Sequence, residues 1–533
     1  MRRLLSAALL VAIGAYGIGS ASADIIFGTS GADRLNGTLQ PDDLYGLGGR
    51  DRIEGRAAND LLDAGRGRDR LLGGAGSDRL LTSGDFEVDT VTCGTGRDIV
   101  NADVVDVVGT NCEIVSRQIS RDIGVDFPAQ HETQVEPDGF SFGSTIVTVF
   151  QSGRHLDGGA ARNGFATSRN GGRTWRSGPL PTGSFDRVSD PVIAYDARHR
   201  WWLAASLALD FSSVATIVNR SRDGLSWSGP IDVARSSTEE YDKEWIVCDN
   251  WRSSRFYGRC YMANMNFARD TIETRHSGDG GRTWSTPVSI DARRQPAITN
   301  GLVIGVRPNG HILLVFSVFG APEGNEIAIA RSSDGGGSFS LPGRVAQMGG
   351  TEVSWLRAPP FPTVDVDAGG TVYVAWRDCE ESADCSADIL LSRSTNGVDW
   401  SPPMRIPTGS AEGFYFLPAL AVAPGTSGRK ARLAVLYHSM SPATLCDPTA
   451  GCLGIDVKMV TSADGGRTWS LPARLNVLSM PPFWMADTSL GRMVGDYVSV
   501  SWSRGRPIGI FSLAFPPSGG LFRQSIFAST RVP

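Results

Sequence analysis

Apolar residues recur along the first part of the chain with a period of nine. They stand at Ile26, Leu35, Leu44, Ile53, Leu62, Leu71 and Leu80. An aspartate lies two positions before each of them, and glycines cluster ahead of the aspartates, as at Gly73, Gly74 and Gly76 before Asp78. Glycines allow the positive φ angles of tight turns, and a lone aliphatic residue between such turns suits a short strand. The pattern predicts a stack of turns and short strands over residues 24–115.

From about residue 120 the pattern changes to short strands of alternating apolar and polar residues, separated by turn signals. Candidate pairs of inner strands begin near Glu136, Pro191, Trp245, Leu302, Pro362, Leu417 and Tyr497. Strands of this kind at regular spacing predict an all-β domain over residues 131–533. The last of the seven units lacks an outer strand. Residues 122–126, within the connection 116–130, could supply it and so join the two ends of the domain.

The nine-residue repeat resembles the Gly-Gly-x-Gly-x-Asp-x-aliphatic repeat of hemolysin-type (RTX) calcium-binding proteins. The match covers residues 24–81 and continues in degenerate form through Asp89 and Asp98. The resemblance implies a short parallel β-roll solenoid whose stacked turns supply the six or more oxygen ligands that Ca²⁺ prefers. The predicted metal-binding residues are Asp33, Asp42, Asp51, Asp60, Asp69, Asp78, Gly31, Gly49, Gly67, Gly74 and Gly76. The alternative is a solenoid that has lost some metal sites and is held together by packing.

Two repeats depart from this pattern. Gln40 and Ala58 stand where the Gly-x pair would begin ahead of Asp42 and Asp60. We expect these two turns to be weaker than the others, because a residue with a Cβ resists positive φ.

A second kind of turn recurs in the later domain. Versions of Ser-x-Asp/Asn-x-Gly-x-Thr-Trp, two of them shortened, occupy residues 168–175, 221–227, 277–284, 332–339, 394–400 and 462–469. They resemble the Asp boxes of sialidase-like β-propellers, where the box joins the third and fourth strands of a blade, away from the central channel. The Asp or Asn accepts the hydrogen bonds of the turn, and the aromatic ring packs between sheets. The resemblance implies an all-β propeller; seven inner-strand units favour seven blades, and six boxes leave six possible.

The N-terminus indicates export. Arg2 and Arg3 precede an apolar stretch, and small residues ending at Ala23 suit a cleavage site, which predicts a signal peptide over residues 1–23 and a secreted, extracellular protein. No later apolar run reaches the ~20 residues of a membrane-spanning helix. The formal net charge of -5 over 533 residues suggests neither a nucleic-acid partner nor an anionic membrane. We expect a monomer.

The eight cysteines fall into four close pairs. They are Cys93 with Cys112, Cys248 with Cys260, Cys379 with Cys385, and Cys446 with Cys452. An even number in an exported chain indicates disulfides, and local pairing is the simplest arrangement. A zinc site is the alternative, but nearby histidines and short Cys-x-x-Cys spacing are lacking. The first pair would cap the open end of the solenoid, and the second would clamp the hairpin after the charged stretch 240–245.

Charged and aromatic residues stand just before the predicted inner strands, where loops would line the mouth of a propeller channel. The candidate catalytic residues are Glu136, Arg187, Asp190, Asp242, Glu244, Arg357, Arg492 and Tyr497. Resemblance to sialidases implies three roles: an arginine clamp for the substrate carboxylate, a tyrosine nucleophile activated by glutamate, and an aspartate acid/base. The three arginines would form the clamp, Tyr497 with Glu136 or Glu244 the nucleophile pair, and Asp190 or Asp242 the acid/base.

One feature departs from the sialidase pattern. Sialidases carry an Arg-Ile-Pro motif near the first inner strand, whereas the only Arg-Ile-Pro here begins at Arg405, after the fifth box and on a predicted outer strand. The histidines are scattered, and the chain has neither a Gly-x-Ser-x-Gly nucleophile elbow nor a phosphate loop.

Two functions from different classes follow. The first is a secreted calcium-binding protein whose propeller binds or processes a glycan at the channel mouth, as a sialidase-like glycoside hydrolase or a true exo-sialidase. The second is a non-catalytic extracellular protein-interaction or adhesion module. Fold alone cannot decide between them. A mouth closed by satisfied ion pairs would favour binding over catalysis.

Overall fold

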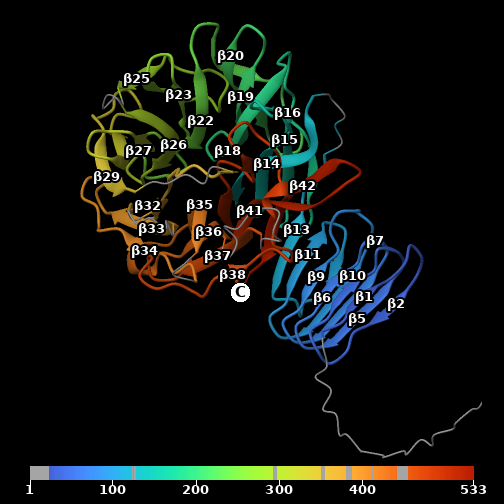
Figure 1. The fold of residues 1–533 in the computed structure, drawn as a ribbon. Helices are drawn as coiled ribbons and strands as arrows, with labels where there is room; N and C mark the ends of the chain where they lie inside the picture. The colour runs from blue at the N-terminus through green and yellow to red at the C-terminus, as the bar shows by residue number, and fades with distance from the viewer. Residues whose placement is uncertain are drawn as a thin grey trace, which may run out of the picture.

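The computed structural model describes residues 23–122, 124, 128–291, 297–349, 355–379, 387–409, 413–440 and 454–532. These residues form an all-β structure in two parts, a solenoid and a larger array of sheets fanned around a common centre (Figure 1). The predicted signal peptide lies outside them except for its last residue. In the described chain no helix has the length and apolar character needed to cross a membrane.

The solenoid is built from parallel strands on two long faces. One face contains β1 (Ile25–Phe27), β3 (Asp43–Tyr45), β6 (Leu61–Asp63), β9 (Arg79–Leu81), β11 (Ile99–Asp103) and β13 (Ile114–Gln118). The other contains β2 (Arg34–Asn36), β5 (Arg52–Ala57), β8 (Arg70–Ala75), β10 (Thr90–Thr95) and β12 (Val107–Val108). A short third pair is β4 (Gly48–Gly49) with β7 (Arg66–Gly67). Successive repeats alternate between the two long faces, so two repeats make one turn.

The periodic aliphatic residues fill the solenoid core. Leu44 lies opposite Leu62, and Leu62 opposite Leu80, in neighbouring strands of one face. These side chains are fully buried, as are those of Ile53 and Leu71 on the other face. The predicted parallel β-roll is therefore confirmed, and its repeat is explained by one stacked aliphatic residue per strand.

A disulfide closes the last turns of the β-roll. Cys93 on β10 is bonded to Cys112, which lies just before β13, and both are buried in the solenoid core. The predicted pairing is thus confirmed. The second predicted disulfide, between Cys248 and Cys260, is also present.

The other two predicted disulfides are not among the bonds that the structure describes. Cys379 ends a strand, but its side chain and its predicted partner Cys385 lie outside the described part of the chain. Cys446 and Cys452 both fall in the undescribed range 441–453. The pairing of Cys379 with Cys385 and that of Cys446 with Cys452 therefore stay predictions.

The second part consists of four-stranded antiparallel sheets, each from one continuous chain segment. Their strands are β14 (Gln130–Phe142), β15 (Thr145–Arg154), β16 (Ala160–Ser168) and β17 (Arg176–Pro179); β18 (Arg187–Asp196), β19 (Trp201–Leu209), β20 (Val214–Ser221) and β21 (Ile231–Ser236); β22 (Tyr241–Cys248), β23 (Cys260–Asn266), β24 (Thr271–Ser277) and β25 (Val288–Asp291); β26 (Ile298–Val306), β27 (Ile312–Phe319), β28 (Asn325–Ser332) and β29 (Gly343–Met348); β31 (Thr363–Val366), β32 (Val372–Cys379), β33 (Ala387–Ser394) and β34 (Met404–Arg405); and β35 (Phe414–Val422), β36 (Leu433–Met440), β37 (Asp456–Ser462) and β38 (Ala473–Arg474).

The final sheet is assembled from both ends of the domain. It contains β40 (Ser499–Ser503), β41 (Arg506–Ser518) and β42 (Leu521–Arg531), and β42 pairs antiparallel with β13. The strand at this position is therefore Ile114–Gln118, whereas 122–126 was predicted. Because β13 also pairs parallel with β11, the β-roll sheet continues directly into the second part. Figure 1 shows β11 and β13 at this junction.

The first strands of successive sheets contact one another around the centre. The circuit runs β14, β18, β22, β26, β31, β35 and β40, and β40 contacts β14. Two short elements lie beside it: β30 (Leu356–Arg357) pairs parallel with β39 (Arg492–Met493). The remaining elements are the 3-10 helices η1 (Gly428–Lys430) and η3 (Pro482–Trp484).

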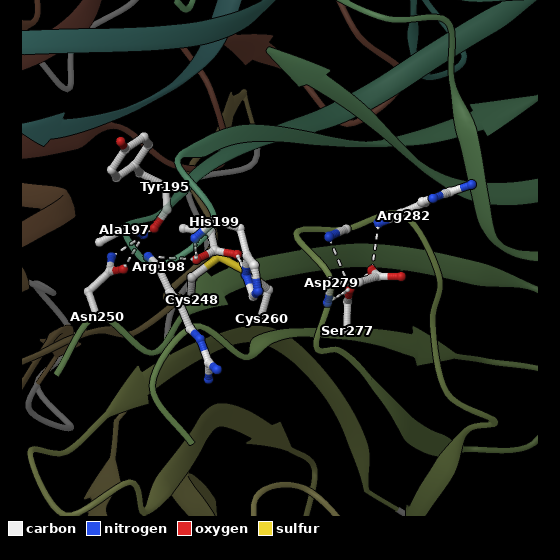
Figure 2. The surroundings of a disulfide bond; sticks show 12 residues. Tyr195, Ala197, Arg198, His199, Cys248, Asn250, Cys260, Ser277, Asp279 and Arg282 are labelled. Carbon is white, nitrogen blue, oxygen red and sulfur yellow. Dashed lines mark hydrogen bonds and ion pairs between the residues drawn. A yellow bond between two sulfur atoms is a disulfide. The ribbon is translucent and has the colours of Figure 1, made fainter. Parts of the chain in front are cut away.

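The Asp-box turns join third to fourth strands, as predicted. In the box after β24, Asp279 Oδ1 accepts hydrogen bonds from the backbone N–H groups of Arg282 (2.9 Å) and Thr283 (3.0 Å), and Ser277 Oγ accepts one from Gly281 (3.0 Å) (Figure 2). Gly280 and Gly281 have φ angles of 73° and 77°, which glycine adopts readily. The boxes are structural turns, and their acidic side chains are used within them.

Candidate functional site

Aspartates of alternate repeats are hydrogen-bonded to one another along the β-roll, and most of them are buried. In each pair one carboxylate oxygen accepts a hydrogen bond from the backbone N–H of an aspartate one turn earlier. The donor and acceptor pairs, at 2.7–3.0 Å, are Asp33 and Asp51, Asp42 and Asp60, Asp51 and Asp69, Asp60 and Asp78, Asp69 and Asp89, and Asp78 and Asp98. The predicted aspartates thus lie on two lines, one for each set of alternate repeats: Asp33, Asp51 and Asp69 on one, and Asp42, Asp60 and Asp78 on the other. Asp89 continues the first line and Asp98 the second, although neither was among the predicted metal ligands.

The second carboxylate oxygen distinguishes the repeats. In Asp33 and Asp42 it accepts hydrogen bonds from Thr29 and Thr38. In Asp51, Asp60, Asp69 and Asp78 it is buried and has no hydrogen-bond partner among the described residues. Burial raises the pKa of Asp60 to about 7 and that of Asp69 and Asp78 to about 6. A cation would compensate the charge of these later aspartates, whereas the first two are already satisfied.

The backbone brings further oxygens to the same places. A Cβ added to Gly55 would lie 2.5 Å from Asp60 Oδ2 and 2.7 Å from the carbonyl oxygen of Gly73. The Asp60 carboxylate and the Gly73 carbonyl oxygen therefore both pack closely against Gly55, and oxygens of these two kinds are ligands that Ca²⁺ prefers. Among the described residues no three acidic, histidine or cysteine side chains cluster as a metal site. Backbone carbonyls would consequently have to supply much of the coordination.

The predicted glycines shape these turns. Gly49, Gly67, Gly74 and Gly76 all have positive φ, whereas Gly31 does not. A Cβ on Gly49 would meet the Gly31 carbonyl group of the previous turn. Ala58 occupies a turn with a φ of 74°, which is strained for a residue with a Cβ. This agrees with the weak turn expected ahead of Asp60.

Five of the charged candidates lie within the first strands and not before them: Glu136, Arg187, Asp190, Asp242 and Glu244. Arg357 and Arg492 do precede first strands, on the short strands β30 and β39. Glu136, Asp190 and Lys243 have φ angles of 52°, 45° and 47°. Each lies at a register shift in β14, β18 or β22, where one extra residue interrupts the pairing. Each bulge interrupts the alternation of apolar and polar residues. The sequence pattern therefore predicted that these strands begin later in the chain than they do. Non-glycine residues in this backbone region are uncommon and strained, and they concentrate at functional sites.

These bulges gather acidic and basic groups at the centre. Glu136 is buried and accepts a hydrogen bond from Gln151 Nε2, and Arg154 Nη1 donates to Gln151 Oε1 at 2.7 Å. Arg357 binds Asp496 through two hydrogen bonds, one of them from Nε at 2.7 Å. Gln151 and Arg154 were not predicted, because they lie on the second strand, where no motif marks them.

The central carboxyl groups differ in their preference for a proton. Burial, together with the charges of Asp190 and Asp496, raises the pKa of Glu136 to about 8. Burial and the charge of Asp190 raise that of Asp242 to about 7. Burial also opposes ionisation of Asp496, but the charge and hydrogen bonds of Arg357 outweigh it and hold its pKa below the usual range. Near neutral pH the site therefore pairs protonated acids with an ionised carboxylate.

Lys243 and Glu244 are buried without hydrogen-bond partners among the described residues. The Lys243 ammonium lies over the Tyr497 ring, 3.7 Å from its centroid, and 4.9 Å from that of Trp245. The adjoining cavity has a volume of about 30 Å³, and its lining includes Lys243, Trp245, Tyr497 and Asp496. A cavity of this size has room for a few water molecules at most.

Tyr497 does not resemble an activated nucleophile in this arrangement. Its hydroxyl donates to the Pro191 carbonyl oxygen at 3.1 Å. Burial and the neighbouring carboxylates Glu136, Asp190 and Glu244 raise its pKa well above the usual value, which disfavours the phenolate.

Each of the three predicted clamp arginines has its own carboxylate neighbour in the structure. Arg357 is paired with Asp496 at the centre, and Arg187 contacts Asp157 at 2.8 Å on a nearby loop. Arg492 donates to the Met485 carbonyl oxygen at 3.1 Å and lies 3.7 Å from Asp487. β30 and β39 do bring Arg357 and Arg492 into neighbouring strands. Arg405 lies on the outer strand β34, as expected, with Asp388 at 2.7 Å.

The disulfide between Cys248 and Cys260 lies at the other end of its hairpin from the charged stretch. It joins the end of β22 to the start of β23, beside Arg198 and His199 of the preceding sheet (Figure 2). The loop it closes, residues 249–259, is thus on the Asp-box side. The disulfide thus clamps the hairpin after the charged stretch, as expected, but at the end away from residues 240–245, which begin β22 and pair with the end of β23.

Comparisons with known proteins find a family match in the first part of the chain and remote likenesses to solved structures. Residues 18–44 and 45–80 match the RTX calcium-binding nonapeptide repeat. No curated protein sequence matches the chain. Among solved structures, a leech intramolecular trans-sialidase is 12% identical, with a TM-score of 0.42, over 60% of this chain and 67% of that chain. An α-L-arabinanase of Penicillium chrysogenum is 14% identical, with a TM-score of 0.42, over 62% and 94%.

A protein of unknown function from Dyadobacter fermentans is 16% identical, with a TM-score of 0.39, over 78% of this chain and 98% of that chain. These likenesses are too distant to assign an activity. The N-terminal segment, by contrast, is identified by its own repeats: it consists of RTX calcium-binding nonapeptide repeats.

Proposed function

We propose that the protein is a secreted, calcium-stabilised binding protein whose propeller holds a glycan at the channel mouth without cleaving it. The state of the predicted clamp arginines carries this proposal. Each already has a carboxylate neighbour: Arg187 has Asp157, Arg357 has Asp496 and Arg492 has Asp487. The central cavity of about 30 Å³ is far smaller than the several hundred Å³ of an ordinary ligand pocket.

Groups suited to a glycan remain accessible around the mouth. The side chains of Arg187 and Arg492 are 34% and 30% exposed. Trp355 lies next to β30, and its carbonyl oxygen accepts a hydrogen bond from the Arg492 backbone. Phe483 of η3 is exposed nearby in the chain. Guanidinium groups bind the carboxylates of acidic sugars, and aromatic rings offer rigid contact area.

The proposal includes the location and the architecture. The export signal and the two disulfides fit an oxidising, extracellular compartment. We infer seven blades, because the first strands make a closed circuit and β13 supplies the outer strand of the last sheet. The domains would be the β-roll at 24–115 and the propeller at 131–533. Asp51, Asp60, Asp69 and Asp78 would hold Ca²⁺ with backbone carbonyls, and Ca²⁺ would cross-link successive turns.

The test compares the mature protein, in calcium, with Arg492→Ala. We expect no hydrolysis of a fluorogenic sialoside by either protein. We expect the wild type to bind acidic oligosaccharides on a glycan array. Arg492→Ala should bind them at least about tenfold more weakly, because it loses one charge-assisted contact. Arg405→Ala, on an outer strand, is the matched control and should bind normally. Turnover by the wild type that disappears in Arg492→Ala would replace the proposal with a sialidase.

One observation favours glycoside hydrolysis as a second candidate. Glu136, with a pKa of about 8, lies beside the ionised Asp496, and a protonated acid next to a carboxylate is the pairing that glycosidases use. Glu136 would then protonate the leaving oxygen once the mouth had opened. Screening neutral and acidic aryl glycosides with Glu136→Gln as the inactive control distinguishes this candidate, because the variant would abolish turnover while retaining binding.

A further inference from the structure

The Asp-box turns lie at the same end of their sheets as the turns between first and second strands. Arginines tie neighbouring sheets together at this end. Arg259 Nη1 donates to the Gly335 carbonyl oxygen (2.8 Å), Arg331 Nη1 to that of Gly397 (3.1 Å) and Arg393 Nη1 to that of Gly465 (2.9 Å). Each bond reaches the box of the next sheet. The two sets of turns therefore form one surface, which we call the Asp-box face.

Basic side chains are exposed around the Asp-box face. In the box turns they are Arg169, Arg173, Arg222, Arg282 and Arg467. In the turns between first and second strands they include Arg198, Arg200, Arg252, Arg255, Arg429 and Lys430. The ion pairs found among the described residues involve none of these side chains. Within the described part of the chain, these charges thus have no carboxylate as an ion-pair partner.

The carboxylates of this face are engaged elsewhere. Asp334 Oδ1 accepts hydrogen bonds from the backbone N–H groups of Gly337 and Ser338, both at 3.0 Å, and Oδ2 accepts one from Ser338 Oγ at 2.6 Å. Asp279 and Asp464 are bound in the same way within their own boxes. The turns themselves therefore supply hydrogen-bond partners to these carboxylates.

The opposite end of the sheets shows the reverse arrangement. There Arg187 contacts Asp157 at 2.8 Å, Arg235 contacts Asp232 at 2.8 Å, and Arg344 contacts Glu326 at 2.6 Å. Arg269 is paired with Glu239. Of the two ends of the sheets, the Asp-box face therefore carries the arginines that have no ion pair among the described residues, in a chain whose formal net charge is -5.

We propose that the Asp-box face binds an acidic polysaccharide through its sulfate or carboxylate groups. Guanidinium groups donate paired hydrogen bonds that match either anion, and many such groups on a broad surface suit a long, repeating polyanion. Among the described residues the face is made of short turns and the three-residue 3-10 helix η1, with neither an α-helix nor a protruding strand pair to enter a nucleic-acid groove. The extracellular location, which rests on the proposed function, also favours a polysaccharide.

The experiment measures binding of the full mature protein, in calcium, to heparin, polygalacturonate, neutral dextran and duplex DNA. The test variant is Arg173→Gln/Arg252→Gln/Arg282→Gln, since none of these side chains donates a hydrogen bond to another described residue. The control, Arg235→Gln/Arg269→Gln/Arg344→Gln, removes the same charge from the opposite end. Unchanged thermal unfolding of the test variant would show that its fold is intact.

We expect the wild type to bind heparin or polygalacturonate with an affinity that falls steeply with salt, and not to bind dextran. The test variant should bind at least about tenfold more weakly and with a shallower salt dependence, because fewer counterions are released. The control should change affinity less than about twofold. Comparing the affinities for heparin and for polygalacturonate distinguishes recognition of sulfate groups from recognition of carboxylate groups.

Equal losses in the two triple variants would overturn the proposal, as would tighter binding to duplex DNA than to either polysaccharide. Arg492→Ala separates this site from the channel mouth. The variant should retain polysaccharide binding even where it loses an oligosaccharide at the mouth, so failure of either site is seen independently.

Discussion

At the scale of single residues, charge and backbone strain coincide at the centre of the ring. Glu136, Asp190 and Lys243 each adopt a left-handed backbone conformation, which costs on the order of 1 kcal/mol or more per residue. The sequence predicted Glu136 and Asp190 as candidates from their charge, and Lys243 lies between the candidates Asp242 and Glu244. It could not show the bulges, because a bulge appears in a sequence only as an interruption of alternation.

The raised pKa of Glu136 predicts a pH-dependent stability. Its value is about 8 in the folded protein against about 4.3 in an unfolded chain. The folded state therefore binds the extra proton between these values, and the stability contributed by the protonated form is lost as pH rises from about 4 to about 8. Glu136→Gln cannot ionise. At pH 9 its free energy of unfolding should exceed that of the wild type by roughly 1–3 kcal/mol, so that it unfolds at a higher temperature, and at pH 4 the two proteins should differ little.

Thermal unfolding at the two pH values measures this difference. Glu323→Gln, on an exposed side chain that is 73% accessible, is the control and should show no such pH dependence. A Glu136→Gln protein destabilised equally at both pH values would mean that Glu136 is ionised and stabilising in the folded state.

At the scale of elements, the two repeated patterns predicted their structures well. The nine-residue period became parallel strands with one aliphatic residue each, and the six boxes became turns between third and fourth strands. Differences between repeats were less visible. Thr29 and Thr38 satisfy the second oxygens of Asp33 and Asp42, while Asp51 to Asp78 lack such donors. Those hydrogen bonds depend on the turn geometry, so a motif match does not separate the two groups.

This difference predicts unequal contributions to calcium binding. Asp69→Asn should weaken calcium-dependent stabilisation, because it removes an oxygen that has no other partner. Asp33→Asn should leave most of it in place. For wild type, calcium at about 100 times its Kd should stabilise the β-roll by roughly 2.7 kcal/mol. Calcium titrations followed by thermal unfolding give the three values, and equal shifts in Asp33→Asn and Asp69→Asn would contradict the assignment.

At the scale of the whole molecule, the β-roll and the ring of sheets share structure. β13 pairs with β11 in the β-roll and with β42 in the ring. Asn101 adds hydrogen bonds across the junction, donating to the Leu475 carbonyl oxygen at 2.9 Å and accepting from the Val477 backbone at 2.7 Å. The sequence predicted that the two ends of the domain join but named the wrong strand. Pairing partners so distant in the chain leave no local pattern.

The shared strand predicts that calcium stabilises part of the ring. Removing calcium with a chelator should speed amide hydrogen exchange in β42, because unravelling of the β-roll exposes its partner β13. Exchange in β27, far from the junction, should be unchanged. Mass spectrometry of peptides covering Leu521–Arg531 and Ile312–Phe319 measures both. Equal protection of β42 with and without calcium would show that β13 stays paired when the β-roll opens.

The β13–β42 pairing also constrains the order in which the chain can fold during synthesis. Ile114–Gln118 emerges from the ribosome and from any export channel before the sheets that follow it, whereas its partner Leu521–Arg531 emerges after them. Contacts this remote in sequence form late, since the intervening chain must first be ordered. If the β-roll folds early, β13 forms an exposed strand edge that stays unpaired on one side until β42 has been synthesised. A chain cut short by even a few dozen residues would keep that edge open, and open strand edges are where chains aggregate.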